Sequence, residues 1–143
     1  MSEKRLKIYL VSGEPSGDLL GARLMRALKQ NANVSFYGVG GESMQAEGME
    51  SLFPISDLAV MGLFEVIPHL KKILSRIKET LDDIEKQKPD IVITIDSWNF
   101  SKEIHLGIKR HLKTHLILFV MLMGNYILQK LNVIMVIPSH LVI

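Results

Sequence analysis

Short apolar segments alternate with amphipathic segments over much of the chain. Residues 7–12, KIYLVS, form a short run rich in β-branched and aromatic side chains, which is typical of a buried strand. In residues 18–30, apolar side chains recur at the spacing of a helix. Residues 34–41, VSFYGVGG, predict a second strand that ends in a glycine turn. This order of strand, helix and strand is that of a βαβ unit.

A long amphipathic helix is the clearest feature of the pattern. Apolar residues recur at helical steps from Val66 to Ile84, polar residues fill the opposite face, and Pro89 ends the helix. Residues 90–96, DIVITID, are dominated by β-branched side chains, as in a parallel strand covered on both faces. Further helices are expected at 42–49 and 101–113. The alternation predicts the α/β class, with a Rossmann-like, doubly wound parallel sheet.

Composition narrows the class of protein. The chain has 143 residues, of which 48% are hydrophobic and 22% charged, as expected for a soluble domain with a core. Its net charge of +2 favours no highly charged partner, and we expect no nucleic acid. There is no cysteine, and the histidines form no metal-binding pair, so we expect no metal. The charged start, MSEKRLK, lacks the apolar core of a signal peptide, so we expect a cytoplasmic location.

A polar loop, GEPSGD at residues 13–18, follows the first predicted strand. Its two glycines permit backbone conformations closed to other residues, Pro15 stiffens the turn, and Ser16 or Asp18 can cap the next helix. Amides at the start of that helix favour an anion, so a phosphate or a sugar hydroxyl fits here. The spacing matches neither the dinucleotide motif, nor the P-loop, nor a hydrolase elbow. The residues alone support a structural turn and a ligand loop equally.

Asp96 ends the strand predicted at 90–96. A carboxylate at the carboxyl end of a buried strand is desolvated on one side and open on the other, which suits a general base. A helix cap or a turn residue explains the same position without catalysis. In an open parallel sheet, ligands bind beyond the carboxyl ends of the strands, where Asp96 and the 13–18 loop are both expected.

Four basic residues lie close together on the long predicted helix, at Lys71, Lys72, Arg76 and Lys78. A solvated outer face accounts for such a run. A basic amphipathic helix also suits contact with anionic lipid headgroups. The pattern alone leaves both interpretations open.

Three segments together resemble the amino-terminal region of lipid-A-disaccharide synthases. They read IYLVSGEPSGDLLGARLMRALK, YGVGGESMQAEGMESLFPISDLAVMGLFEV and KPDIVITID, and they occur in the family's order from about Lys7 to Asp96. The resemblance implies the amino-terminal half of a GT-B fold, in which two Rossmann-like domains face a cleft. It implies an inverting transfer of 2,3-diacylglucosamine from UDP-diacylglucosamine to 2,3-diacylglucosamine 1-phosphate, giving lipid A disaccharide 1-phosphate and UDP. It also implies no metal, no cofactor, and a peripheral position on the inner face of the bacterial inner membrane.

The resemblance further implies roles for individual residues. Asp96 matches the family's essential aspartate and is the expected base. The LAVMG segment and the helix after it are expected near the membrane, so Lys71, Lys72, Arg76 and Lys78 are expected to contact headgroups. The residues expected to bind substrate, with the GEPSGD loop on the acceptor side, are Gly13, Glu14, Ser16, Gly17, Asp18, Met61 and Gly62.

The sequence departs from the family pattern after Asp96. SWNFS replaces the usual Pro-Asp-Phe-Asn, and residues 116–143 become strongly apolar with Lys130 as their sole charged residue. We therefore expect an acceptor-side domain at 1–115 and a divergent apolar tail at 116–143, which a frameshift would explain. The UDP-sugar domain is expected to be absent, so that activity requires a separately encoded carboxyl-terminal half. The alternatives are a non-enzymatic relic and a small Rossmann-like module that binds a nucleotide or sugar phosphate.

Overall fold

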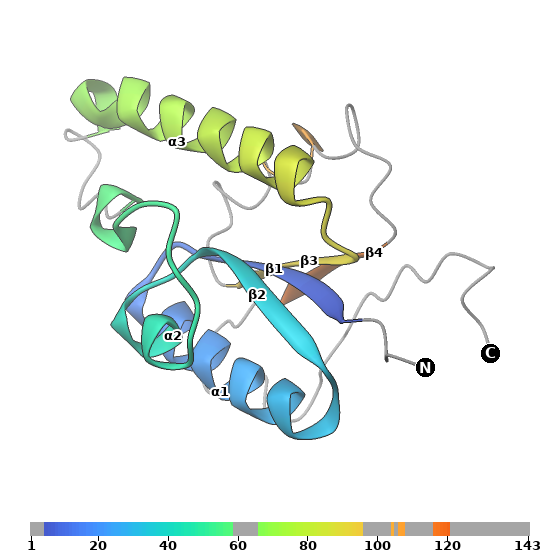
Figure 1. Cartoon of the computed structure of the whole chain (residues 1–143). Helices are drawn as coiled ribbons and strands as arrows, with labels where there is room; N and C mark the ends of the chain where they lie inside the picture. The colour runs from blue at the N-terminus through green and yellow to red at the C-terminus, as the bar shows by residue number, and fades with distance from the viewer. Residues whose placement is uncertain (1–4, 59–65, 96–103, 105, 108–115, 121–143) are drawn as a thin grey trace.

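The computed structural model describes residues 5–58, 66–95, 104, 106–107 and 116–120 (Figure 1). Along the chain, its elements are β1 (Leu6–Ser12), α1 (Pro15–Asn31), β2 (Val34–Val39), α2 (Glu42–Ala46), the 3-10 helix η1 (Ile55–Leu58), α3 (Val66–Gln87), β3 (Ile91–Ile95) and β4 (Leu116–Val120). The alternation of strands and helices confirms the predicted α/β class.

The described strands form one parallel sheet in the order β2-β1-β3-β4. The chain leaves β1 through α1 to reach β2 on one side, and returns through α3 to reach β3 on the other side. The direction of winding therefore reverses at β1, which makes the sheet doubly wound, as predicted. Because the strands are parallel, their carboxyl ends all lie at one edge. In sheets of this kind, ligands bind where the winding reverses, which here is at the ends of β1 and β3.

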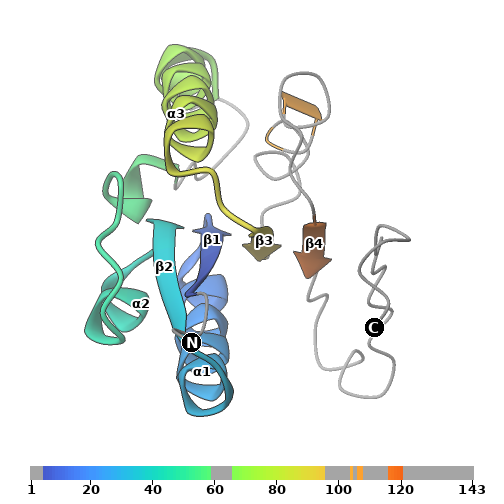
Figure 2. The same cartoon turned by 45° about the vertical axis from the view of Figure 1, so that its right-hand side comes forward.

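Helices cover both faces of the sheet, with α1 and α2 on one side and α3 on the other (Figures 1 and 2). Side chains of β1 alternate between the two faces. Ile8 and Leu10 belong to the core cluster that includes Met25 of α1, whereas Tyr9 belongs to the cluster that includes Ile84 of α3. Burial on both faces explains why the central strands read as nearly continuous apolar runs.

Helix boundaries differ from the sequence expectation where a loop residue joins a helix. α1 begins at Pro15 rather than at residue 18, because proline is well suited to a first helical position. The expectation that Ser16 or Asp18 caps α1 was wrong, since the N-cap residue is Glu14 and no side chain makes a capping hydrogen bond. α2 is shorter than expected, and Gly48 follows it with a positive φ of 96°.

The structure describes only part of two other expected segments, the helix at 101–113 and the apolar segment at 116–143. Ile104, Leu106 and Gly107 are helical, in agreement with the helix expected at 101–113, most of which lies outside the described residues. Leu116–Val120, at the start of the apolar segment 116–143, pair with β3 as β4. Within the described part of the chain, no helix is long and apolar enough to cross a membrane.

Candidate functional site

The ends of β1 and β3 lie side by side at the carboxyl edge of the sheet. Ser12, the last residue of β1, is the register partner of Ile95, the last residue of β3. The GEPSGD loop begins one residue after Ser12, and Asp96 comes one residue after Ile95 in the sequence. Asp96 itself lies outside the described residues. The two strands that lead to the expected loops are thus adjacent.

Gly17 lets the first turn of α1 approach both strands closely. A Cβ atom at this position would lie 2.7 Å from Ser12 Oγ and 3.2 Å from the Ile95 carbonyl oxygen. The loop glycines were expected to adopt backbone conformations closed to other residues, but neither Gly13 nor Gly17 has a positive φ. Gly17 is required because a helix and two strands meet there with no room for a side chain.

Glu14 is held by its backbone while its side chain stays at the surface. Its carbonyl oxygen accepts a hydrogen bond from Ser12 Oγ at 3.0 Å and another from the Asp18 amide at 3.0 Å. Ser12 and Gly13 are buried, whereas Glu14, Pro15 and Ser16 are exposed. The loop therefore presents a carboxylate and a hydroxyl from a fixed backbone. The adjacent helix start, which no side chain caps, favours an oxygen of a phosphate or sugar.

The Asp18 carboxylate is buried and points to α2. Its Oδ1 accepts hydrogen bonds from the amides of Gly41 at 2.8 Å and Met44 at 3.0 Å, and its Oδ2 accepts one from Ser43 at 2.9 Å. The N-cap residue of α2 is Gly41, which has no side chain to cap the helix. Asp18 supplies that cap from α1. The Gly40-Gly41 pair before a helix was the sequence signal for this contact, which the sequence argument missed.

Two of the four predicted basic residues on α3 are engaged in ion pairs. Asp57 of η1 binds Lys72 at 2.6 Å and Arg76 at 2.6 Å, and the hydrogen bond from Lys72 is the main reason why the pKa of Asp57 is lowered. Arg76 also lies 4.7 Å from the centre of the Phe53 ring and pairs with Glu79, which raises its pKa. These contacts fix η1 against α3.

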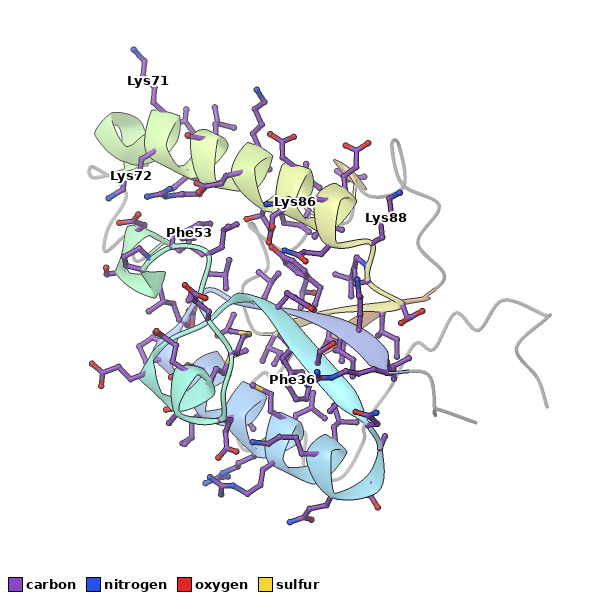
Figure 3. All side chains as sticks on the ribbon, in the orientation of Figure 1. Phe36, Phe53, Lys71, Lys72, Lys86 and Lys88 are labelled. Carbon is purple, nitrogen blue, oxygen red and sulfur yellow. The ribbon has the colours of Figure 1, made fainter. Side chains whose placement is uncertain are left out.

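The other two basic residues, Lys71 and Lys78, are exposed. Figure 3 shows Lys71 pointing away from the body of the molecule, whereas Lys72 points toward η1. Leu70 and Leu74 are 48% and 55% exposed on the same helix, although the sequence pattern assigned them to the buried face. Leu74 lies one helical turn from both Lys71 and Lys78, at the flank of the apolar stripe, and this position was the signal for its exposure.

The structure brings together only part of the predicted site. Gly13, Glu14, Ser16 and Gly17 lie at the carboxyl edge of the sheet beside β3. Met61 and Gly62 lie outside the described residues, as does Asp96. Among the residues that the structure describes, no group of three or more His, Asp or Glu side chains is placed to hold a metal ion.

The parallel sheet order and the reversal of winding at β1 define a Rossmann-like α/β domain. A family model described as lipid-A-disaccharide synthetase matches residues 8–122. The chain belongs to this family.

Individual relatives agree with this assignment. The lipid-A-disaccharide synthase of Paramagnetospirillum magneticum is 60% identical over 104 residues, which cover 71% of this chain and 27% of that protein. The synthase of Gluconobacter oxydans is 52% identical, over 72% of this chain and 25% of that protein. The chain thus spans about a quarter of the length of these curated relatives.

A solved structure supports the fold. The UDP-GlcNAc 2-epimerase from Neisseria meningitidis, bound to UDP-GlcNAc, aligns with a TM-score of 0.53 at 14% identity. The alignment covers 80% of this chain and 32% of the epimerase. At this identity the likeness concerns the fold, which agrees with the expected Rossmann-like half of a GT-B architecture.

Proposed function

We propose that this chain forms the acceptor side of a lipid-A-disaccharide synthase. The reaction transfers 2,3-diacylglucosamine from UDP-diacylglucosamine to the 6-hydroxyl of 2,3-diacylglucosamine 1-phosphate, with inversion at the anomeric carbon. The products are lipid A disaccharide 1-phosphate and UDP. The observation that carries the proposal is the family match over residues 8–122, which includes the carboxyl ends of both strands at the winding reversal.

In this proposal, Asp96 is the general base and the GEPSGD loop holds the acceptor. Asp96 takes the proton of the acceptor hydroxyl as its oxygen attacks the anomeric carbon, and the bond to UDP breaks in the same displacement. The exposed Glu14 and Ser16 side chains offer hydrogen-bonding groups to sugar hydroxyls, and the uncapped start of α1 favours a phosphate. The adjacency of Ser12 and Ile95 supports this arrangement because it brings the two loops to one edge.

We assign the binding of the donor UDP-sugar to the portion of the relatives that this chain does not match. We therefore expect no turnover from this chain alone with both substrates. We expect turnover when its matching region replaces the corresponding region of the Paramagnetospirillum magneticum relative, which is 60% identical to it. A separately supplied carboxyl-terminal half is expected to have the same effect as this chimera.

The test measures disaccharide formation by the chimera and by its Asp96→Ala variant. Loss of turnover in Asp96→Ala, with turnover kept in Asp82→Ala on the exposed face of α3, supports the proposed base. Unchanged turnover in Asp96→Ala removes Asp96 from the mechanism. A folded chimera without turnover, or disaccharide formed by this chain alone, contradicts the proposed division of the reaction.

We also propose that α3 contacts the anionic surface of the inner face of the inner membrane, where both lipid substrates reside. Leu70 and Leu74 offer exposed apolar area, and Lys71 and Lys78 offer positive charge on the same helix. Lys72 and Arg76 are already paired with Asp57 and are expected to contribute less. The peripheral location of the protein is part of this proposal.

A further inference from the structure

Asp18 joins three segments of the chain through its backbone and its side chain. Its amide donates to the carbonyl oxygen of Glu14 in the loop after β1, at 3.0 Å. Its carboxylate accepts from the amides of Gly41, Ser43 and Met44, at the junction of β2 and α2. The residue is 6% exposed, so its side chain faces the protein interior. One residue therefore connects the β1–α1 loop to the β2–α2 loop.

The packing around this contact leaves little room for adjustment. A Cβ atom at Gly41 would lie 2.7 Å from Oδ2 of the Asp18 carboxylate, which three backbone amides hold in place. At Gly17, the residue before Asp18, a Cβ atom would lie 2.7 Å from Ser12 Oγ and 3.2 Å from the Ile95 carbonyl oxygen. Because Gly41 packs against the Asp18 carboxylate and Gly17 packs against the ends of β1 and β3, we expect a shift of α2 to be transmitted to the first turn of α1.

The two ends of α2 are attached to α1 by different residues. Glu47, after the carboxyl end of α2, pairs with Lys29 at 2.7 Å and with Arg26 at 2.5 Å. At the amino-terminal end, the amides of α2 donate to the Asp18 carboxylate. Loss of Glu47 loosens the end remote from the GEPSGD loop, whereas loss of Asp18 loosens the end attached to it.

We propose that Asp18 is a positioning residue of the acceptor site, and that it acts by fixing the backbone of residues 14–17 rather than by touching substrate. The inference rests on the proposed function for the identity of the ligand. Its physical basis is that both carboxylate oxygens are used by backbone amides, while the exposed groups of the loop are those of Glu14 and Ser16. The buried acid of the GEPSGD motif thereby has a structural role, which is to fix the loop that precedes it.

The experiment combines amide hydrogen exchange, measured by NMR, with binding of 2,3-diacylglucosamine 1-phosphate to the full chain. The variants are Asp18→Asn, which keeps one acceptor oxygen, Asp18→Ala, which keeps none, and the matched control Glu47→Gln. Each is compared at a temperature where the folded fractions are equal. In both Asp18 variants, the amide hydrogens of residues 17 and 18 are expected to exchange about tenfold faster or more, because hydrogen bonds from α2 to the residue 18 side chain are lost. Binding is expected to weaken by about tenfold, and more in Asp18→Ala than in Asp18→Asn.

The control separates positioning from a general loss of stability. Glu47→Gln is expected to change neither the exchange of Gly17 and Asp18 nor the affinity for the acceptor. Weaker binding without faster exchange in Asp18→Asn indicates direct contact and overturns the inference. Faster exchange confined to Gly41, Ser43 and Met44, with normal binding, reduces Asp18 to a cap for α2 and also overturns it. If the unaltered chain does not bind the acceptor, the proposed function fails, while exchange at Gly17 and Asp18 still decides whether Asp18 fixes the loop.

Discussion

Ser12 and Ile95 are register partners at the ends of the adjacent parallel strands β1 and β3. The pairing brings together two segments that are far apart in the sequence, one leading into the GEPSGD loop and the other into Asp96. Gly17 of α1 packs against both residues. This three-way contact is the part of the candidate site that tertiary structure creates, and it gives a direct test of the geometry.

Gly17→Ala is expected to destabilise the fold. Alanine normally favours a helix over glycine by about 1 kcal/mol, so propensity alone predicts a gain in stability. At this position the added Cβ would lie 2.7 Å from Ser12 Oγ and 3.2 Å from the backbone oxygen of Ile95, and the backbone cannot yield easily. We expect the free energy of unfolding to fall by roughly 1–3 kcal/mol, measured by urea denaturation.

Gly21→Ala is the matched control on the same helix. Its Cβ would meet the side chain of Met44, including the sulfur at 2.5 Å, rather than a backbone atom. Because methionine is flexible, Met44 can adopt another rotamer, and the loss of stability should be smaller than in Gly17→Ala. Equal or greater loss in Gly21→Ala would show that contact with the ends of β1 and β3 is not what restricts residue 17.

Tyr9 is expected to make stability fall at alkaline pH. Its fully buried hydroxyl donates to Asp83 Oδ2 at 2.8 Å, and burial, together with this hydrogen bond, raises the pKa of Tyr9 well above its ordinary value of 10.0. Above that value the unfolded chain releases the tyrosine proton while the folded chain keeps it. The contribution of Tyr9 is therefore complete below pH 10.0 and is lost as the pH rises further.

The measurement compares the unaltered chain with Tyr9→Phe in urea from about pH 8 to about pH 11. At the alkaline end, Tyr9 should make the free energy of unfolding fall by about 1.4 kcal/mol per pH unit. This contribution should be missing in Tyr9→Phe. At neutral pH the variant should be less stable by about 1 kcal/mol, because the Asp83 carboxylate loses a donor. Identical slopes for the two proteins would contradict a buried, protonated Tyr9.

Leu70→Ser and Leu74→Ser, combined, are expected to weaken binding to vesicles that contain phosphatidylglycerol. Both side chains are about half exposed, at 48% and 55%, so their loss should change the stability of the fold little. Removal of two leucines from a membrane contact should lower the affinity for these vesicles by about tenfold or more, as measured by cosedimentation. Leu19→Ser is the control, since Leu19 is 49% exposed on α1, on the other face of the sheet. Equal weakening in the control would place the contact elsewhere.

Asp57→Asn is expected to strengthen binding to the same vesicles. The substitution removes the ion pairs that Asp57 makes with Lys72 and Arg76. Arg76 keeps its pair with Glu79, so the main gain is that Lys72 can reach lipid phosphates. Glu47→Gln causes the same change in net charge on the α1–α2 side and serves as the control. Binding should rise more in Asp57→Asn, and the difference should shrink as salt is added. Equal effects of the two variants would mean that net charge alone governs binding.

The same substitution tests the electrostatic role of Asp57 in the fold. The hydrogen bonds from Lys72 and Arg76 hold the pKa of Asp57 below its ordinary value of 3.8. A lowered pKa means that its contribution is present above the pKa of the unfolded chain and is lost as the pH falls through the lower, folded value. Thermal unfolding should show Asp57→Asn slightly less stable at neutral pH and equal to the unaltered chain in strong acid.

The fold class followed from local patterns, because periodicity is a property of neighbouring residues. The apolar runs at 7–12 and 90–96 are continuous because β1 and β3 are buried on both faces. The helical spacing after Val66 predicted α3 for the same reason, since its inner stripe packs on the sheet. Boundaries were less certain where a loop residue such as Pro15 joins a helix, because that choice depends on the packing of the first turn.

By itself, the sequence determined the alternation of elements, the parallel sheet and the position of a polar loop after the first strand. Only the tertiary structure decided that Gly17 serves close packing, that Asp18 caps α2, and that Asp57 pairs with Lys72 and Arg76. Each of these contacts joins elements that are separate in the sequence, and a local pattern carries no information about such a partner. The physical reason is that hydrogen bonds and close approaches form between surfaces, which exist only after the strands and helices have packed.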